Sequence, residues 1–71
     1  MSDIPIVGEI ARDIQAKCAE GSERVIFGGY GNCMVAKISG IEEAAEVFKN
    51  LKMEEAAKIC EDLADELKSI L

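Results

Sequence analysis

The predicted fold depends on one stretch, residues 24–38, which reads RVIFGGYGNCMVAKI. Its two ends, residues 24–27 and 33–38, are rich in β-branched and bulky side chains, which is typical of β-strands. The five residues between them include three glycines and an asparagine, which readily adopt the positive φ angles of a tight turn. The stretch therefore predicts an antiparallel β-hairpin.

Apolar residues upstream of this hairpin recur at spacings of three and four, the period of an amphipathic helix. The pattern predicts a helix over about residues 4–19. Pro5 falls in its first turn, where a missing N–H is tolerated, and Gly21 offers a left-handed stop after its end.

Downstream of the hairpin, Ser39 is followed three residues later by Glu42, which is the spacing of a capping box at the start of a helix. The apolar stripe then changes phase near Asn50, which favours two helices with a left-handed terminator at Asn50 over one kinked helix spanning residues 41–71. The predicted fold class is therefore α+β: an N-terminal helix, an antiparallel β-hairpin, then a short and a long C-terminal helix (α-β-β-α-α). All of it belongs to a single small domain, residues 1–71.

A chain of 71 residues buries only about 60% of its unfolded surface, so such a domain usually needs a metal, disulfides or association. Its three cysteines, Cys18, Cys33 and Cys60, include no CxxC pair, and the absence of histidine argues against a zinc site. We expect neither a signal peptide nor a disulfide framework, and we interpret Cys18 and Cys60 as core residues. The two apolar faces of the hairpin then predict association with a protein partner or with a second copy, as a homodimer.

The charge of the chain narrows its possible partners. Fourteen acidic and eight basic residues give a net charge of −6, which repels nucleic-acid backbones and anionic lipid headgroups. No run approaches the roughly 20 apolar residues needed to span a bilayer. We therefore expect a cytoplasmic protein that binds neither nucleic acid nor membrane.

Two features are candidates for a binding or chemical role. The glycine-rich loop is a candidate contact site for a partner or ligand, although it lacks the GxGxxG and GxxxxGK[ST] patterns and no helix is expected after it. Cys33 follows this loop directly, where backbone N–H groups favour a thiolate, so it is the candidate reactive thiol. The loop residues are Gly28, Gly29, Tyr30, Gly31 and Asn32, with Tyr30 expected to be exposed at the tip.

Catalytic and metal-binding patterns are scarce. Without histidine, a serine or cysteine nucleophile lacks its usual imidazole activator, so we expect no enzymatic activity and no cofactor. The acidic residues near the C-terminus lack the alternating spacing and central glycine of a calcium loop. We interpret them as a solvated helix face and leave weak binding of Ca²⁺ or Mg²⁺ open: they are Glu61, Asp62, Asp65 and Glu66.

Residues 9–38, with a predicted helix followed by the hairpin, resemble the second half of a roadblock-type domain. The resemblance implies a sheet that dimerises in a scaffolding role. The chain departs from the family pattern after Gly40, where the family has a third strand, so no site residue is transferred from it.

The leading interpretation is a small acidic interaction module that self-associates through its β-hairpin and has no catalytic activity of its own. One alternative is a small ligand-binding or thiol-redox module that uses the glycine-rich loop and Cys33. Another is an accessory subunit of a larger enzyme complex.

Overall fold

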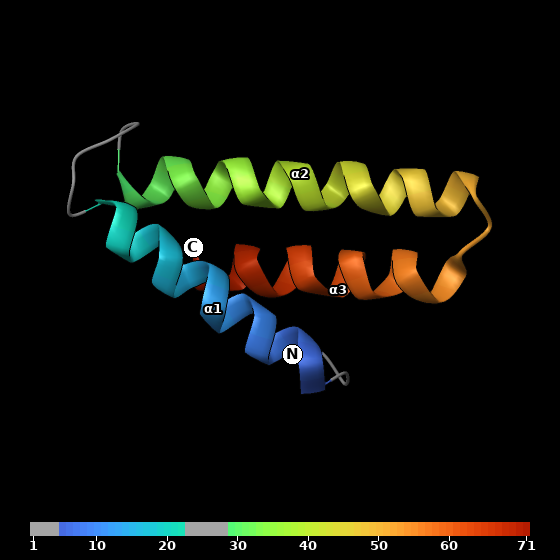
Figure 1. Ribbon diagram of the computed structural model, residues 1–71, viewed down its shortest axis with the longest axis horizontal. Helices are drawn as coiled ribbons and strands as arrows, with labels where there is room; N and C mark the ends of the chain where they lie inside the picture. Colours follow the sequence, from blue (N-terminus) through green and yellow to red (C-terminus); the bar gives the residue numbers. More distant parts are fainter. Residues whose placement is uncertain (1–4, 23–28) are drawn as a thin grey trace.

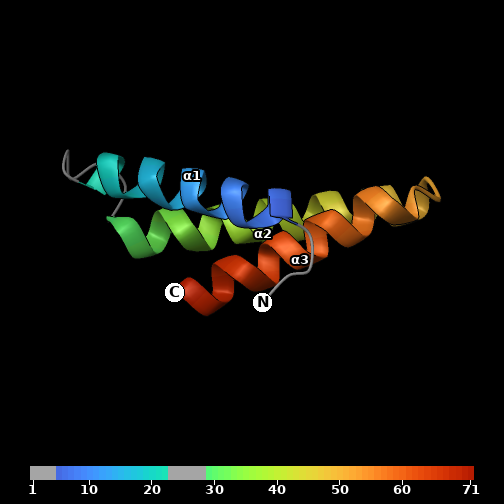
Figure 2. The same ribbon diagram turned by 90° about the horizontal axis from the view of Figure 1, so that it is seen from below.

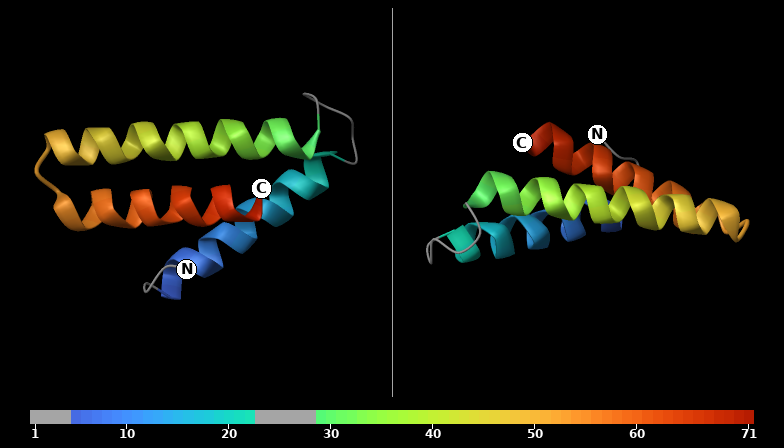
Figure 3. Two further views of the ribbon diagram at one scale, coloured as in Figure 1. Left: turned by 180° about the vertical axis from the view of Figure 1, so that it is seen from behind. Right: turned by 90° about the horizontal axis from the view of Figure 1, so that it is seen from above.

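A computed structural model describes residues 5–22 and 29–71, which form three α-helices: α1 (Pro5–Ser22), α2 (Tyr30–Asn50) and α3 (Glu54–Ile70). Figure 1 shows α2 and α3 running antiparallel side by side, joined by a short turn, with α1 crossing them obliquely. The view in Figure 2 and the two views in Figure 3 place α1 on one face of this α2–α3 hairpin. The architecture is therefore one helix laid over a helical hairpin.

The predicted α+β fold class is wrong, because the described part of the chain contains helices and no strand. Of the two predicted strands, residues 33–38 lie inside α2, while residues 24–27 lie outside the described residues. Met34 and Ile38 are buried, whereas Ala36 between them is exposed. The segment therefore follows the period of a helix and not the period of two that a strand requires.

α2 is much longer than the short helix predicted in this region. Its inward-facing apolar residues follow one another at alternating spacings of four and three: Met34, Ile38, Ile41, Ala45 and Phe48. This continuous stripe carries the helix through Ser39 and Gly40, so the predicted capping box at Ser39 and Glu42 is wrong. The Ser39 and Glu42 side chains are instead exposed in the interior of α2.

α2 begins within the glycine-rich sequence that was expected to form the turn of the β-hairpin. Gly29 is the N-cap residue, with φ 91° and ψ −171°, in a region of backbone conformation that favours glycine. The Cys33 N–H donates to the Gly29 carbonyl at 3.2 Å, which opens the helical hydrogen-bond pattern. The glycines therefore serve the start of a helix.

α1 agrees with the prediction at its start and differs at its end. Pro5 is the first helical residue, the position where its missing N–H costs nothing. The helix continues through Gly21 to Ser22, so the predicted stop at Gly21 is wrong. Val7, Ala11 and Cys18 are buried on the side of α1 that faces the hairpin.

The predicted break between the second and third helices is confirmed, but its left-handed residue is Lys52 (φ 61°) and not Asn50. The Met53 N–H donates to the Phe48 carbonyl at 2.8 Å, and the Lys52 N–H donates to the Lys49 carbonyl at 3.0 Å. These two bonds form the Schellman pattern, which ends many helices at a left-handed residue.

The core lies between α1 and the half of the hairpin formed by the N-terminal part of α2 and the C-terminal part of α3. Within the described residues, no polar or charged residue is buried. Four of the ten buried residues are alanines, so the core is small for its number of residues. The buried cluster comprises Val7, Ala11, Cys18, Met34, Ile38, Leu63, Ala64 and Leu67.

We call residues 44–60 the distal end of the hairpin. Figures 1 and 3 show that α1 does not extend over it. Ala45 and Ala57 are buried within this range, but every residue of the buried cluster, including Ala64, lies outside it. The radius of gyration is 12.6 Å, compared with about 11 Å expected for a compact chain of this length. The distal end is therefore a two-helix extension that α1 does not cover.

Substitution of Gly40 tests whether the predicted capping box, residues 39–42, lies in the interior of a helix. A Cβ atom added at Gly40 meets nothing within 4 Å, and the position is exposed. Gly40→Ala should therefore raise the free energy of unfolding by about 0.5–1 kcal/mol, because alanine loses less backbone entropy in a helix. Gly29→Ala should lower it, because the φ of 91° strains any residue with a Cβ. Urea unfolding of both variants measures these effects, and destabilisation by Gly40→Ala would contradict the helical assignment.

The position of the left-handed residue is tested by a second pair of variants. Lys52→Gly should raise the free energy of unfolding by about 1 kcal/mol, because glycine adopts a positive φ without steric cost. Asn50→Gly, at the last residue of α2, should lower it, because glycine is a poor helix former. Thermal unfolding followed by circular dichroism measures both, and stabilisation by Asn50→Gly would place the terminator at Asn50.

Candidate interaction surface

Three large apolar side chains are exposed at the distal end: Val47 (54%), Leu51 (62%) and Met53 (49%). Val47 and Leu51 are four residues apart, so they lie on the same side of adjacent helical turns. The Leu51 N–H donates to the Val47 carbonyl at 3.0 Å, which continues the helical pattern to that residue. We call Val47, Leu51 and Met53 the distal patch.

An open hollow adjoins the distal patch at the start of α3. Its lining combines apolar and charged side chains: Lys52, Met53, Glu54, Glu55, Ala56 and Ile59. Ile59 also packs against the buried cluster. Through Met53 and Ile59, the hollow therefore connects the distal patch with the core beneath α1.

The distal end is electrically neutral, although the chain is acidic. Residues 44–60 contain three lysines and three glutamates, namely Lys49, Lys52, Lys58, Glu46, Glu54 and Glu55. The net charge of the whole chain is −6, so the entire acidic excess lies outside the distal end. Another acidic protein therefore meets less net repulsion at the distal end than the average over the whole chain.

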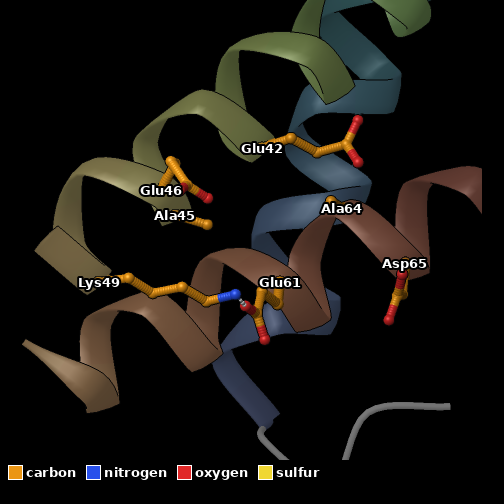
Figure 4. A pocket seen from close by; sticks show the side chains of 7 residues that line it. All are labelled: Glu42, Ala45, Glu46, Lys49, Glu61, Ala64 and Asp65. Carbon is orange, nitrogen blue, oxygen red and sulfur yellow. Dashed lines mark ion pairs between the residues drawn. The ribbon is translucent and has the colours of Figure 1, made fainter.

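A groove follows the contact between α2 and α3 on the face that points away from α1 (Figure 4). Its lining contains four carboxylates and one ammonium group: Glu42, Glu46, Glu61, Asp65 and Lys49. Ala45 and Ala64, both buried, complete the lining from the two helices. Because an ion pair between Lys49 and Glu61 crosses the groove, we interpret it as the boundary between two packed helices and assign no ligand to it.

Two ion pairs join α2 to α3. Lys49 pairs with Glu61, and Nζ of Lys68 lies 3.0 Å from Oε2 of Glu42. In each pair, the hydrogen bond to the carboxylate and then its charge raise the pKa of the lysine above the ordinary value of 10.5. All four side chains are well exposed, so these pairs are weak contributors to the stability of the fold.

The predicted contact loop lies at the start of α2, at the opposite end of that helix from the distal patch. Gly28 is outside the described residues, Gly29 is the N-cap residue, and Gly31 and Asn32 are exposed in the first turn. Tyr30 was expected to be exposed, but it packs against the buried cluster, and its hydroxyl is buried without a hydrogen-bond partner. A contact role for the loop stays a prediction.

Cys33, the candidate reactive thiol, forms a disulfide with Cys18. Their Cα atoms are 5.6 Å apart, which is a typical separation for a disulfide. The expectation that the chain has no disulfide is therefore wrong, and Cys60 is the thiol left over from the odd count. The spacing of cysteines in the sequence could not show this pairing, because the fold decides which of them meet.

Metal sites and membrane spans were both searched for over residues 5–22 and 29–71. No group of three His, Cys, Asp or Glu side chains in these ranges could hold a metal ion. None of their helices combines the length and apolar character needed to cross a bilayer. Within the predicted acidic face, Glu61 and Asp65 border the groove, and Glu61 is paired with Lys49.

The sequence analysis did not identify the distal patch. The available signal was a pair of large apolar residues, Val47 and Leu51, four positions apart and outside the buried stripe of α2. Because the β-hairpin was the predicted contact surface, these two residues were not considered as a contact site.

The raised lysine pKa values predict how stability changes at alkaline pH. The two pairs stabilise the fold fully below the ordinary lysine pKa of 10.5, and this contribution is lost as the pH rises through the raised values. The free energy of unfolding should therefore fall above pH 10.5, and it should fall less steeply in a Lys49→Arg, Lys68→Arg variant, because arginine stays protonated. Urea unfolding between about pH 9 and 12 measures both slopes, and identical slopes would contradict the assignment.

Comparisons with known proteins do not place the chain in a family. No family model matches the sequence, and neither curated proteins nor solved structures give a match. The resemblance to a roadblock-type domain gains no support from these comparisons, and residues 33–38, its expected second strand, belong to α2. A functional assignment therefore depends on the surface of the molecule itself.

Proposed function

We propose that this protein is a small helical interaction module that self-associates through the distal end of its α2–α3 hairpin. The observation that carries the proposal is the distal patch, whose three large apolar side chains are about half exposed or more. The patch lies at the end of the hairpin that α1 does not cover. In a dimer, the hairpin of a second copy covers this end, as α1 covers the other half.

The distribution of charge supports a second copy as the partner. Two chains of net charge −6 repel one another overall. At the neutral distal end, Lys52 is followed closely by Glu54 and Glu55. A two-fold arrangement can therefore set a lysine of one copy opposite a glutamate of the other, which makes the surface complementary to itself.

The small core also supports association. The buried cluster has eight residues, and two of them are alanines, Ala11 and Ala64. Domains of this size commonly rely on a disulfide, a metal or a second subunit in addition to their core. Burying the distal patch removes further apolar area from water, at about 25 cal/mol per Å².

A cytoplasmic location is part of the proposal. Cys60 is an unpaired, half-buried thiol, which is more typical of a reducing compartment than of a secreted protein. In such a compartment, the Cys18–Cys33 bond would be in contact with cellular thiol reductants.

Two valines of α2 provide a matched test of the distal patch. Val47 and Val35 are 54% and 56% exposed, but only Val47 lies at the distal end. Val47→Gln should raise the dissociation constant of the dimer about thirtyfold, because each of the two copies loses about 1 kcal/mol of apolar burial. Val35→Gln should leave it unchanged. Sedimentation equilibrium from tens to hundreds of micromolar measures both.

Two outcomes of that experiment would overturn the proposal. One is a wild-type chain that sediments as a monomer at hundreds of micromolar. The other is a dimer that the two substitutions weaken equally, since the contact would then lie away from the distal patch.

A further inference from the structure

One disulfide cross-links α1 to the helical hairpin, in addition to the main chain. Cys18, near the C-terminal end of α1, is bonded to Cys33, near the N-terminal end of α2. Cys18 is fully buried and Cys33 is half-buried. The bond therefore ties the C-terminal end of α1 to the N-terminal end of α2, and these two helix ends are neighbours along the chain.

The other attachments of α1 differ from those between α2 and α3. Two polar contacts of α1, from Arg12 to the Gly8 carbonyl and from Lys17 to Asp13, stay within the helix, and the side chains of α1 described as buried are apolar. α2 and α3 are joined by two ion pairs and by the short Schellman turn. The disulfide adds a covalent cross-link to this packing, so Cys18 cannot move away from Cys33 while the bond is intact.

α1 covers the main apolar face of the hairpin. Met34, Ile38, Leu63 and Leu67 are buried in the cluster that the apolar side chains of α1 complete. Ile59 packs against this cluster and also lines the hollow beside the distal patch. If α1 moves away, the covered face and the distal patch become one continuous apolar surface.

We propose that the Cys18–Cys33 disulfide is a redox-controlled latch: a dithiol reductant opens it, α1 detaches from the hairpin, and the face beneath α1 becomes a docking surface for a second copy of this chain, continuous with the distal patch. The use of that surface for docking rests on the proposed function. The release of α1 does not, because it depends only on the disulfide and on the packing of α1.

The chemistry of opening is thiol–disulfide exchange. A thiolate of the dithiol attacks Sγ of Cys33, the more exposed partner, and forms a mixed disulfide while the S–S bond to Cys18 breaks. Cys18 leaves as a thiolate and takes up a proton. The second thiol of the reductant then attacks the mixed disulfide and releases Cys33, which also takes up a proton. The protein gains two electrons and two protons, and the dithiol is oxidised to a disulfide.

Hydrogen–deuterium exchange on the full chain tests the latch without reference to any partner. The experiment uses a Cys60→Ser background, so that the third thiol cannot exchange with the disulfide. Dithiothreitol is the dithiol reductant. On reduction, amides of α1 should exchange at least tenfold faster, while those in the central turns of α2 and α3 should change less than twofold. A Cys18→Ala, Cys33→Ala control should show fast exchange in α1 with and without dithiothreitol.

Three results would overturn the inference. The first is an air-exposed protein whose mass shows only free thiols. The second is an α1 that exchanges less than threefold faster after reduction. The third is a similar acceleration in all three helices, which would show that the bond stabilises the whole fold and does not control α1. Sedimentation equilibrium of the reduced chain tests docking separately. If the reduced chain does not self-associate, the exchange result for α1 still stands.

Discussion

The packing of α2 against α3 sets the geometry on which the other features depend. Ala45 and Ala64 are buried along this contact, and their small side chains let the two helices approach closely. The short turn at Lys52 returns α3 antiparallel to α2. The cross-helix ion pairs are solvated and are secondary to this packing. The result is a flat helical hairpin with one groove-bearing face and one face that α1 covers.

α1 covers only part of that face because of its length and its point of attachment. Its 18 residues rise about 27 Å, whereas the 21 residues of α2 rise about 32 Å, and α1 crosses the hairpin obliquely. Since its C-terminal end is bonded near the start of α2, its coverage begins at that end. The distal end is consequently not covered by α1, and Val47, Leu51 and Met53 stay about half exposed or more.

Local signals in the sequence predicted the helical elements at both ends but not the segment between them. Pro5 marked the start of α1, and the change of phase near Asn50 marked the break between α2 and α3. The β-branched residues Val35 and Ile38 favoured a strand locally, but they lie in α2 because an apolar stripe from Met34 to Phe48 packs against the other helices. The pairing of Cys18 with Cys33 depends on where α1 lies, which no local pattern encodes, whereas the distal patch left a local signal in the spacing of Val47 and Leu51.

The core is small for the length of the chain. A disulfide and the burial of an exposed apolar surface in a partner are two ways of stabilising such a domain. In this molecule they are coupled through α1. The bond between Cys18 and Cys33 keeps α1 on one half of the hairpin, and the other half carries the distal patch. A contact that stabilises one half of the hairpin therefore changes how much the stability of the fold depends on the other half. A second copy on the distal patch would therefore stabilise α2 and α3 independently of α1, so that the hairpin stays folded when the disulfide is reduced.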